Sequence, residues 1–250
     1  LALTGLGCLI GGIIEGGALG FSAPVVLALL AVGAVALVAF AYSQSKVPAP
    51  MMPLSLFRNR GMRVAVVGGF AMIFNWNALV FLATLYLQQQ LGLSTLMAGL
   101  LFVPSALTST VGNMLSDRIG GSRGTRFTAL LGFTIIALCY GLLFLFSGGL
   151  SEPVMVIALC LCGLGGGTTT PTLANLVLRS ADAETGGIAS AVFNTMRQVG
   201  GAVGIALFGV LVTVAPTFNQ GMTACFAIST ALTALALALA FTLPRRRARA

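Results

Sequence analysis

The stretch NTMRQVGGAVG, residues 194–204, lies inside an otherwise apolar run that covers residues 187–214. A run of this length allows an α-helix to cross a hydrocarbon core about 30 Å thick. The whole chain is similarly apolar: 58% of its 250 residues are hydrophobic and 7% are charged, whereas soluble domains carry about a quarter charged residues. The sequence therefore predicts an all-α polytopic membrane protein, with Arg197 at membrane depth.

Eight apolar runs are predicted to be transmembrane helices, although the first is short. They cover residues 1–14, 24–41, 64–87, 96–115, 127–146, 154–178, 187–214 and 222–243. Because the first run is short and the chain begins with leucine, we expect a fragment that is cut inside a helix.

The basic residues indicate how the chain is oriented in the membrane. Twelve of the 13 Lys and Arg residues lie in alternate connections or after the last run, namely Lys46, Arg58, Arg60, Arg63, Arg118, Arg123, Arg126, Arg179, Arg245, Arg246, Arg247 and Arg249. Basic residues are retained on the cytoplasmic side during insertion, so the carboxyl terminus is predicted to be cytoplasmic. The tail PRRRARA, residues 244–250, fits this bias and does not imply a nucleic-acid partner.

The longest polar connection divides the chain into two membrane parts. We predict two transmembrane helices in residues 1–42, a cytoplasmic linker in 43–63, a six-helix bundle in 64–244 and a basic cytoplasmic tail in 245–250. Part of the linker mixes apolar and basic residues, which suits a segment lying on the anionic inner leaflet. Membrane lipid is therefore an expected partner.

Arg197 is the basic residue that this topology does not explain, since it lies about 15 Å into its run, near the membrane midplane. At about 100° per residue it shares a helix face with the polar or small residues Ser190, Asn194, Gly201 and Gly204 and with Phe208, and Gln198 lies on the flank. In one interpretation Arg197 clamps backbone carbonyls of neighbouring helices, while Gly200 and Gly204 form a close-approach surface. In the other, this face lines an aqueous cavity, where the fixed charge acts on a substrate or on a proton-carrying carboxylate.

Two further groups of residues interrupt the apolar runs. Asn75 and Asn77 lie near the middle of their run, where their amides either bond across helices or face a cavity. Gly165, Gly167 and Pro171 lie in GLGGGTTTP, residues 163–171, where a proline removes a helix hydrogen bond close to several glycines. This pattern predicts a hinge or a discontinuous helix, with close helix packing as the alternative.

Several kinds of chemistry lack candidate residues. The chain has no histidine, and its five cysteines all fall within apolar runs, so no metal site, cofactor or catalytic residue is predicted. None of the carboxylates lies deep in a complete run. Because arginine does not release its proton, a carboxylate that couples transport to a proton gradient would have to lie elsewhere in the whole protein.

One segment resembles the cytoplasmic signature G-x-L-x-D-R-x-G-x-[RK] of the major facilitator superfamily. In NMLSDRIGGSR, residues 113–123, the matching residues are Leu115, Asp117, Arg118 and Gly120. The leading glycine is displaced to Gly112, and Arg123 comes one residue late. In the family the acidic residue pairs with a basic residue and latches a cytoplasmic gate, a role that the resemblance extends to Asp117, with Arg126 or Arg123 as its partner.

Four other strings appear in the order typical of fourteen-span drug:proton antiporters of this superfamily. They are PLSLFRNR at 53–60, YLQQQLGLS at 86–94, GLGGGTTTP at 163–171 and FNTMRQVGGAVG at 193–204. The resemblance covers nearly the whole chain. It implies that residues 1–42 are the central extra helix pair, that the last six helices are the carboxyl-terminal bundle, and that an amino-terminal six-helix bundle is missing.

The resemblance implies proton-driven export of small hydrophobic or drug-like compounds from the cytoplasm, across the plasma membrane, by alternating access. Such a protein is not an enzyme; it uses a proton gradient rather than a cofactor, and it is expected to be a monomer. Two alternatives remain: a dedicated exporter of one self-made metabolite, and a non-transporting receptor or scaffold on the same fold.

Overall fold

The structure is a computed structural model that describes residues 1–46, 54–182 and 185–244. Within these ranges the chain is all-α, as predicted. Its elements are α1 (Ala2–Leu19), α2 (Pro24–Lys46), η1 (Leu54–Arg58), α3 (Arg60–Leu85), the π-helical turn η2 (Tyr86–Gln90), α4 (Thr95–Leu100), α5 (Val103–Arg123), α6 (Thr125–Leu145), α7 (Glu152–Ser180), α8 (Gly186–Val214) and α9 (Phe218–Phe241). Seven described segments are long and apolar enough to cross a membrane, and a shorter apolar helix at Ala2–Gly17 matches the first predicted run, at 1–14.

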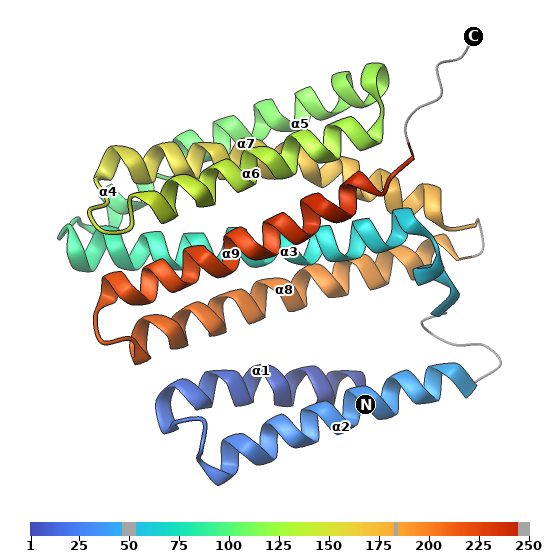
Figure 1. Cartoon of the computed structure of the whole chain (residues 1–250), viewed down its shortest axis with the longest axis horizontal. Coiled ribbons are helices and arrows are strands. Elements are labelled where there is room, and N and C mark those ends of the chain that lie inside the picture. The colour runs from blue at the N-terminus through green and yellow to red at the C-terminus, as the bar shows by residue number, and fades with distance from the viewer. Residues whose placement is uncertain (47–53, 183–184, 245–250) are drawn as a thin grey trace.

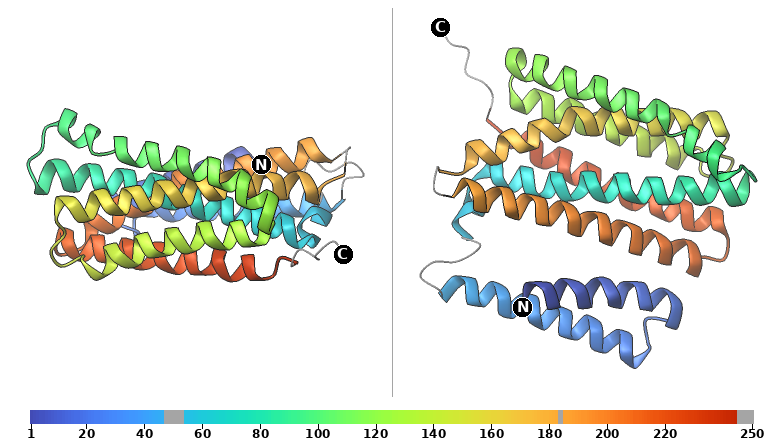
Figure 2. Two further views of the ribbon diagram at one scale, coloured as in Figure 1. Left: turned by 90° about the horizontal axis from the view of Figure 1, so that it is seen from above. Right: turned by 180° about the vertical axis from the view of Figure 1, so that it is seen from behind.

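The long helices form one bundle, beside which the α1–α2 pair lies (Figure 1). In the orientation of Figure 1, α6 and α9 form the nearer layer, and the reverse view in Figure 2 brings α3, α5, α7 and α8 to the front. The pair contacts the bundle through α1, where Gly17 lies close to Val210 of α8. One face of α3, α5, α7 and α8 is therefore left uncovered by α6 and α9.

Two predicted boundaries change in the structure. The linker predicted at 43–63 is helical at both ends, since α2 runs to Lys46 and α3 begins at Arg60. Residues 47–53 of that linker and the predicted tail at 245–250 lie outside the described residues. Asn59 marks the start of α3, because its Oδ1 accepts a hydrogen bond of 2.8 Å from the backbone N–H of Gly61.

The run predicted at 96–115 is two helices, α4 and α5, with a break at Leu101 and Phe102. Pro104 lies in the first turn of α5 and has no N–H to donate. A helix can therefore begin at this proline, but a continuous helix through it would lose a hydrogen bond. At the other end, α5 continues to Arg123. The signature residues at 113–123 therefore lie in the last turns of a helix, which corrects their predicted placement in a loop.

Small residues let the helices of the bundle approach closely. The backbone of α7 at Gly163 and Gly167 lies against the carbonyl groups of Ser105 and Ser109 on α5. A side chain at either glycine would overlap those carbonyl oxygens. Between membrane helices such close packing replaces the hydrophobic effect as a source of stability. Larger side chains fill the space among α3, α6 and α9, where the fully buried residues include Leu79, Phe133, Tyr140 and Phe226.

Candidate functional site

Helix α8 packs closely on α3 through the glycines of the opening stretch. A Cβ atom added at Gly200 would lie 2.5 Å from the carbonyl oxygen of Phe70, and one at Gly204 would lie 2.6 Å from that of Phe74. Both distances are well below van der Waals contact, so only glycine allows this approach of the two backbones. The predicted close-approach surface at Gly200 and Gly204 is confirmed.

The Arg197 side chain folds back along its own helix. Its Nη1 donates a hydrogen bond of 3.4 Å to Oδ1 of Asn194, and its guanidinium carbon lies 5.5 Å from the ring centroid of Phe193. Gly69 of α3 is close to the Arg197 stem, since a Cβ there would lie 3.1 Å from the Arg197 Cγ. The Nε is buried and has no hydrogen-bond partner in the described part of the chain. The predicted clamp on carbonyls of neighbouring helices is therefore not formed among the described residues.

A small cavity opens among α3, α5, α6 and α7. Its volume is about 180 Å³. The lining residues are Met72, Ile73, Trp76, Ser109, Ile136, Cys162, Gly163, Gly166 and Thr170. Ile73 also approaches Gly201 of α8, so the residue links this cavity to the Arg197 helix. The cavity combines an aromatic and aliphatic wall with the hydroxyl groups of Ser109 and Thr170, a composition suited to a mainly apolar ligand.

None of the polar residues predicted to face a cavity lines this one. Asn194 and Gln198 are exposed on α8, and Arg197 is half-buried, but these three do not line the cavity. Asn77 is half-buried and points toward α8, where its amide nitrogen is close to Gly201. The structure thus places the Asn194, Arg197 and Gln198 group one helix away from the cavity, with α3 between.

Asn75 lies inside the bundle, and its predicted place in a cavity is wrong. It is 1% exposed, and its Nδ2 donates a hydrogen bond of 2.8 Å to Oγ1 of Thr233 on α9. Its backbone carbonyl accepts a hydrogen bond of 2.5 Å from the Tyr140 hydroxyl on α6. The alternative prediction, an amide that bonds across helices, is confirmed. The reason is geometric, because residue 75 lies on the side of α3 that faces α6 and α9.

Replacement of Thr233 by valine is expected to lower the free energy of unfolding by about 1 kcal/mol, because it leaves the Asn75 amide unpartnered. The measurement is detergent-induced unfolding of the purified chain. Thr230→Val is the matched control, since the Thr230 hydroxyl bonds to the Phe226 carbonyl of its own helix. Equal destabilisation by the two substitutions would show that the cross-helix bond contributes nothing.

Helix α7 is not interrupted at the predicted hinge. The helix is continuous from Glu152 to Ser180, with Pro171 inside it. Gly165 approaches the Gly132 carbonyl of α6, and Gly167 approaches the Ser109 carbonyl of α5. Threonine hydroxyls bond to carbonyls of the preceding turn, including Thr169 to Gly165 at 2.7 Å and Thr170 to Gly166 at 2.8 Å. The discontinuous helix is therefore wrong, the close-packing alternative is confirmed, and bending at Pro171 stays a prediction.

The predicted gate residues lie at the end of the bundle that carries most of the arginines. Asp117, Gly120 and Arg179 line a cavity of about 180 Å³ between α5 and α7. Arg126 lies outside this cavity, and the described residues include no ion pair of Asp117 with Arg126 or Arg123. Arg118 is exposed on α5. The structure thus brings Arg179, which the sequence did not suggest as a partner, into the cavity of Asp117.

The sequence also did not identify Thr233, Tyr140, Ser109 or Thr170 as important. Each is a hydroxyl-bearing residue in an apolar run, a pattern that recurs along this chain and does not distinguish one position from another. Thr233, Tyr140 and Thr170 each have a hydrogen-bond partner on another helix, so a single helical wheel carries no signal for them. Pairing the polar residues of different runs would have offered Asn75 and Thr233 as candidates, among many other pairs.

Comparisons with known proteins agree with this architecture. The sequence matches the Major Facilitator Superfamily over residues 1–205. The methylenomycin A resistance protein of Bacillus subtilis is 28% identical over 242 residues, which cover 96% of this chain and 52% of that protein. The multidrug resistance protein Stp of Mycobacterium tuberculosis is 27% identical over 210 residues, covering 84% of this chain and 39% of its own length.

The tetracenomycin C resistance and export protein of Streptomyces glaucescens is 26% identical over 204 residues, covering 82% of this chain and 38% of its own length. The chain thus spans about half the length, or less, of the curated relatives that it matches. The names of these relatives describe resistance and export and none describes an enzyme, in agreement with the prediction that this chain is not one. The chain is part of a multi-pass membrane protein and belongs to the major facilitator superfamily.

Proposed function

We propose that this chain is the carboxyl-terminal part of a secondary-active exporter of small, mainly hydrophobic compounds. The proposal is supported by relatives named for drug resistance and efflux, each matched over most of the chain. The exporter lies in the plasma membrane with its carboxyl terminus in the cytoplasm, because the basic residues are concentrated at that end. It works by proton antiport and alternating access, as a monomer, and the chain alone does not transport.

The observation that carries the proposal is the cavity among α3, α5, α6 and α7, together with a half-buried arginine in the middle of α8, one helix away. Helices α3, α5, α7 and α8 form the layer that α6 and α9 leave uncovered (Figure 2). A charge at membrane depth is costly unless it faces protein or water. A second bundle packed against this face would enclose the cavity and Arg197 together, as alternating access between two bundles requires.

The cavity can be tested with a substitution that fills it. A Cβ atom added at Gly166 has no neighbour within 4 Å, so Gly166→Leu places its side chain in the cavity without displacing the backbone. In the full-length protein we expect export of an organic cation such as ethidium to fall by about tenfold or more, with normal expression. Gly148→Leu, in the connection between α6 and α7, also meets nothing within 4 Å and is the control. Undiminished export by Gly166→Leu would exclude the cavity from the substrate path.

Proton coupling needs its own measurement. Everted membrane vesicles that contain the full-length protein and a pH-sensitive dye are expected to lose part of their proton gradient when an exported compound is added. Vesicles that export a compound without any proton movement would contradict antiport. Described carboxylates such as Asp117 and Glu152 lie toward helix ends, so we place the coupling carboxylate outside this chain.

A second candidate, export of a single metabolite, is favoured by relatives named for one antibiotic each. These include the methylenomycin A and tetracenomycin C resistance proteins. The two candidates differ in the breadth of resistance that the full-length protein confers on a sensitive host. Protection against several unrelated compounds supports multidrug efflux, whereas protection against one supports a dedicated exporter.

The gate prediction can be tested by charge removal. Asp117→Asn in the full-length protein is expected to lower turnover by about tenfold, because it weakens a latch that holds the arginine-rich end closed. Arg179→Gln is expected to have a similar effect, since Arg179 lines the same cavity. In a double-mutant cycle the two should be coupled, whereas Asp117 and Arg58, an exposed residue of η1, should be independent. Unchanged transport kinetics in Asp117→Asn would reject the latch.

A further inference from the structure

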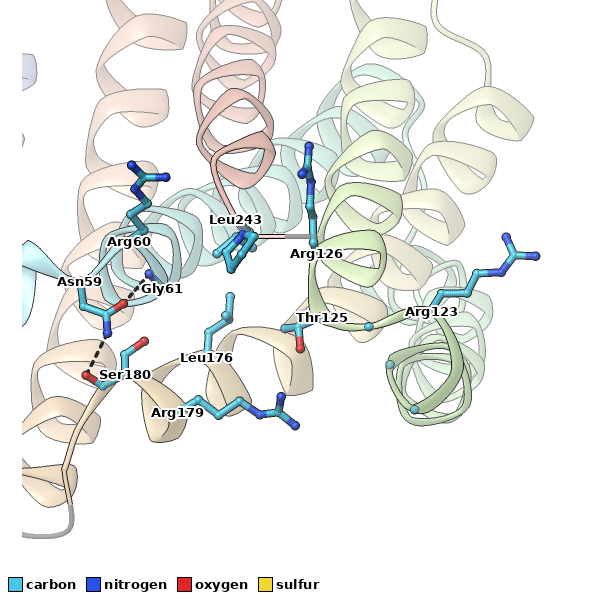
Figure 3. Close-up of a pocket in the computed structure, with 14 residues that line it drawn as sticks. Asn59, Arg60, Gly61, Arg123, Thr125, Arg126, Leu176, Arg179, Ser180 and Leu243 are labelled. Atoms are coloured by element: carbon cyan, nitrogen blue, oxygen red, sulfur yellow. Dashed lines mark hydrogen bonds between the residues drawn. The ribbon is translucent and has the colours of Figure 1, made fainter. Parts of the chain in front are cut away.

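A cavity lined by several arginines lies at the arginine-rich end of the bundle, next to the cavity of Asp117, with which it shares Gly120, Gly121, Thr125 and Arg179. It has a volume of about 720 Å³ and lies where α3 and α6 begin and where α5, α7 and α9 end. Four arginines line it: Arg60, Arg123, Arg126 and Arg179. Figure 3 shows Arg60 and Arg126 on either side of Leu243, with Arg179 on another wall and Arg123 directed away.

The positive charge of this cavity is not neutralised by the described protein. Among the described residues no Asp or Glu lines it, and the Arg60 and Arg126 guanidinium groups have no hydrogen-bond or ion-pair partner there. Arg123 lies against a ring, with its guanidinium carbon 5.0 Å from the centroid of Phe127. Arg179 also lines the cavity of Asp117. Arg60 and Arg126 are therefore the pair left to bind an anion.

The backbone adds to the positive potential at the same place. Helix α6 starts at Thr125 without a side-chain cap, since its N-cap residue is Gly124. Helix α3 also starts beside this cavity, at Arg60, but there the Gly61 N–H already donates to Asn59 Oδ1. The first N–H groups of a helix and its dipole both favour an anion, which reinforces the arginine side chains.

An adjoining cavity gives the same arginines an apolar neighbour. It has a volume of about 600 Å³, shares Arg60, Arg126, Leu243 and Pro244 with the first, and adds Arg63, Val64, Leu239, Phe241 and Thr242. Phe241 is 56% exposed. Further along the same layer, Leu138 of α6 and Leu235 of α9 are 60% and 52% exposed, as expected for helices that face lipid. The arginine pair thus lies where two cavities meet, and each cavity has both charged and apolar walls.

We propose that Arg60 and Arg126 bind the phosphate group of an anionic lipid, with Arg63 beside them and one acyl chain along Leu239 and Phe241. Guanidinium groups match phosphate geometry and charge, and basic pockets between membrane helices favour anionic headgroups. A free phosphate would satisfy the arginines but leave the exposed Phe241 and the neighbouring Leu239 without an apolar partner, which favours the lipid. The proposal depends on the membrane-spanning fold and not on the exported compound.

The test is lipid binding to the full-length protein, purified in detergent and measured by native mass spectrometry. Phosphatidylglycerol is expected to bind at least tenfold more tightly than phosphatidylcholine, whose phosphate is neutralised by its own choline. Inorganic phosphate is the second arm. If the chain binds inorganic phosphate as tightly as phosphatidylglycerol, or shows no preference between the two lipids, the lipid site is rejected. These comparisons use the unaltered chain, so they do not depend on the folding of a variant.

Charge-neutral variants then locate the site. Arg60→Gln and Arg126→Gln are each expected to weaken phosphatidylglycerol binding by about fivefold, and the double variant by about 25-fold. Arg58→Gln is the control, because Arg58 is exposed at the same end and lines neither cavity. Binding by the double variant at the strength of Arg58→Gln would overturn the assignment. Circular dichroism of each variant serves as the check that its helical content is unchanged.

Discussion

Replacing Gly167 with alanine is expected to lower the free energy of unfolding by about 3 kcal/mol, because the added methyl group overlaps the Ser109 carbonyl. The overlap involves backbone on both sides, so it is relieved only by separating α5 from α7. These two helices meet largely through this surface, and the loss of close packing removes the main attraction between membrane helices. Thermal unfolding of the purified chain in detergent measures the change.

The adjacent residue provides the control. A Cβ atom at Gly166 meets nothing within 4 Å, so Gly166→Ala is expected to be neutral or to stabilise by up to about 1 kcal/mol through helix propensity. Comparing Gly166→Ala with Gly167→Ala distinguishes backbone flexibility from close helix packing as the role of these glycines. If the glycines serve only backbone flexibility, both substitutions act alike, whereas close packing gives opposite signs at neighbouring positions. A Gly167→Ala chain as stable as Gly166→Ala would contradict the packing described here.

Arg197→Ala in the full-length protein is expected to reduce transport by about 100-fold, and Arg197→Lys by about tenfold, with little loss of stability. Lysine keeps the charge but loses the planar group that lies over Phe193 and donates to Asn194. Stability changes little because the recorded contacts of the guanidinium group are with its own helix and do not hold two helices together. Initial rates of export at equal expression measure the effect.

Two controls accompany the Arg197 variants. Thr195→Ala changes an exposed side chain two residues away and is expected to leave transport unchanged. The melting temperature of each variant distinguishes a transport role from a structural one, since a clamp between helices would lower both. Full transport by Arg197→Ala would exclude a functional role, and a parallel fall in melting temperature would assign the residue to packing instead.

Much of the fold follows from features that each segment carries by itself. The apolar runs predicted the long helices, because apolar length alone decides whether a helix can cross a membrane. The residues at which the helices begin and end were less predictable. Helix α5 continues through Asp117 and Arg118, since charged residues end an apolar run without ending a helix. The break before α5 had a local signal in Pro104 that hydropathy does not register.

The site was predictable only in part, for a related reason. Gly200 and Gly204 predicted the close approach of another helix, because two glycines four residues apart lie on the same face of one helix. Asn75 and Asn77 are two residues apart, and a helix turns about 200° over that distance, so they point in different directions. Which of them meets α9 and which meets α8 depends on where the neighbouring helices lie, and the sequence of α3 does not contain that information.

The sequence by itself determined that this protein crosses a membrane and that its basic residues lie in alternate connections, and it predicted an arginine at membrane depth. These properties depend on the free energy of placing each residue in hydrocarbon. That free energy can be added up within one segment, without knowing how the segments pack. The tertiary structure decided which polar groups pair, that Asp117 shares a cavity with Arg179, and that Arg60 and Arg126 flank one cavity. Such contacts join residues far apart in the chain, and only the packing of the helices sets their distances.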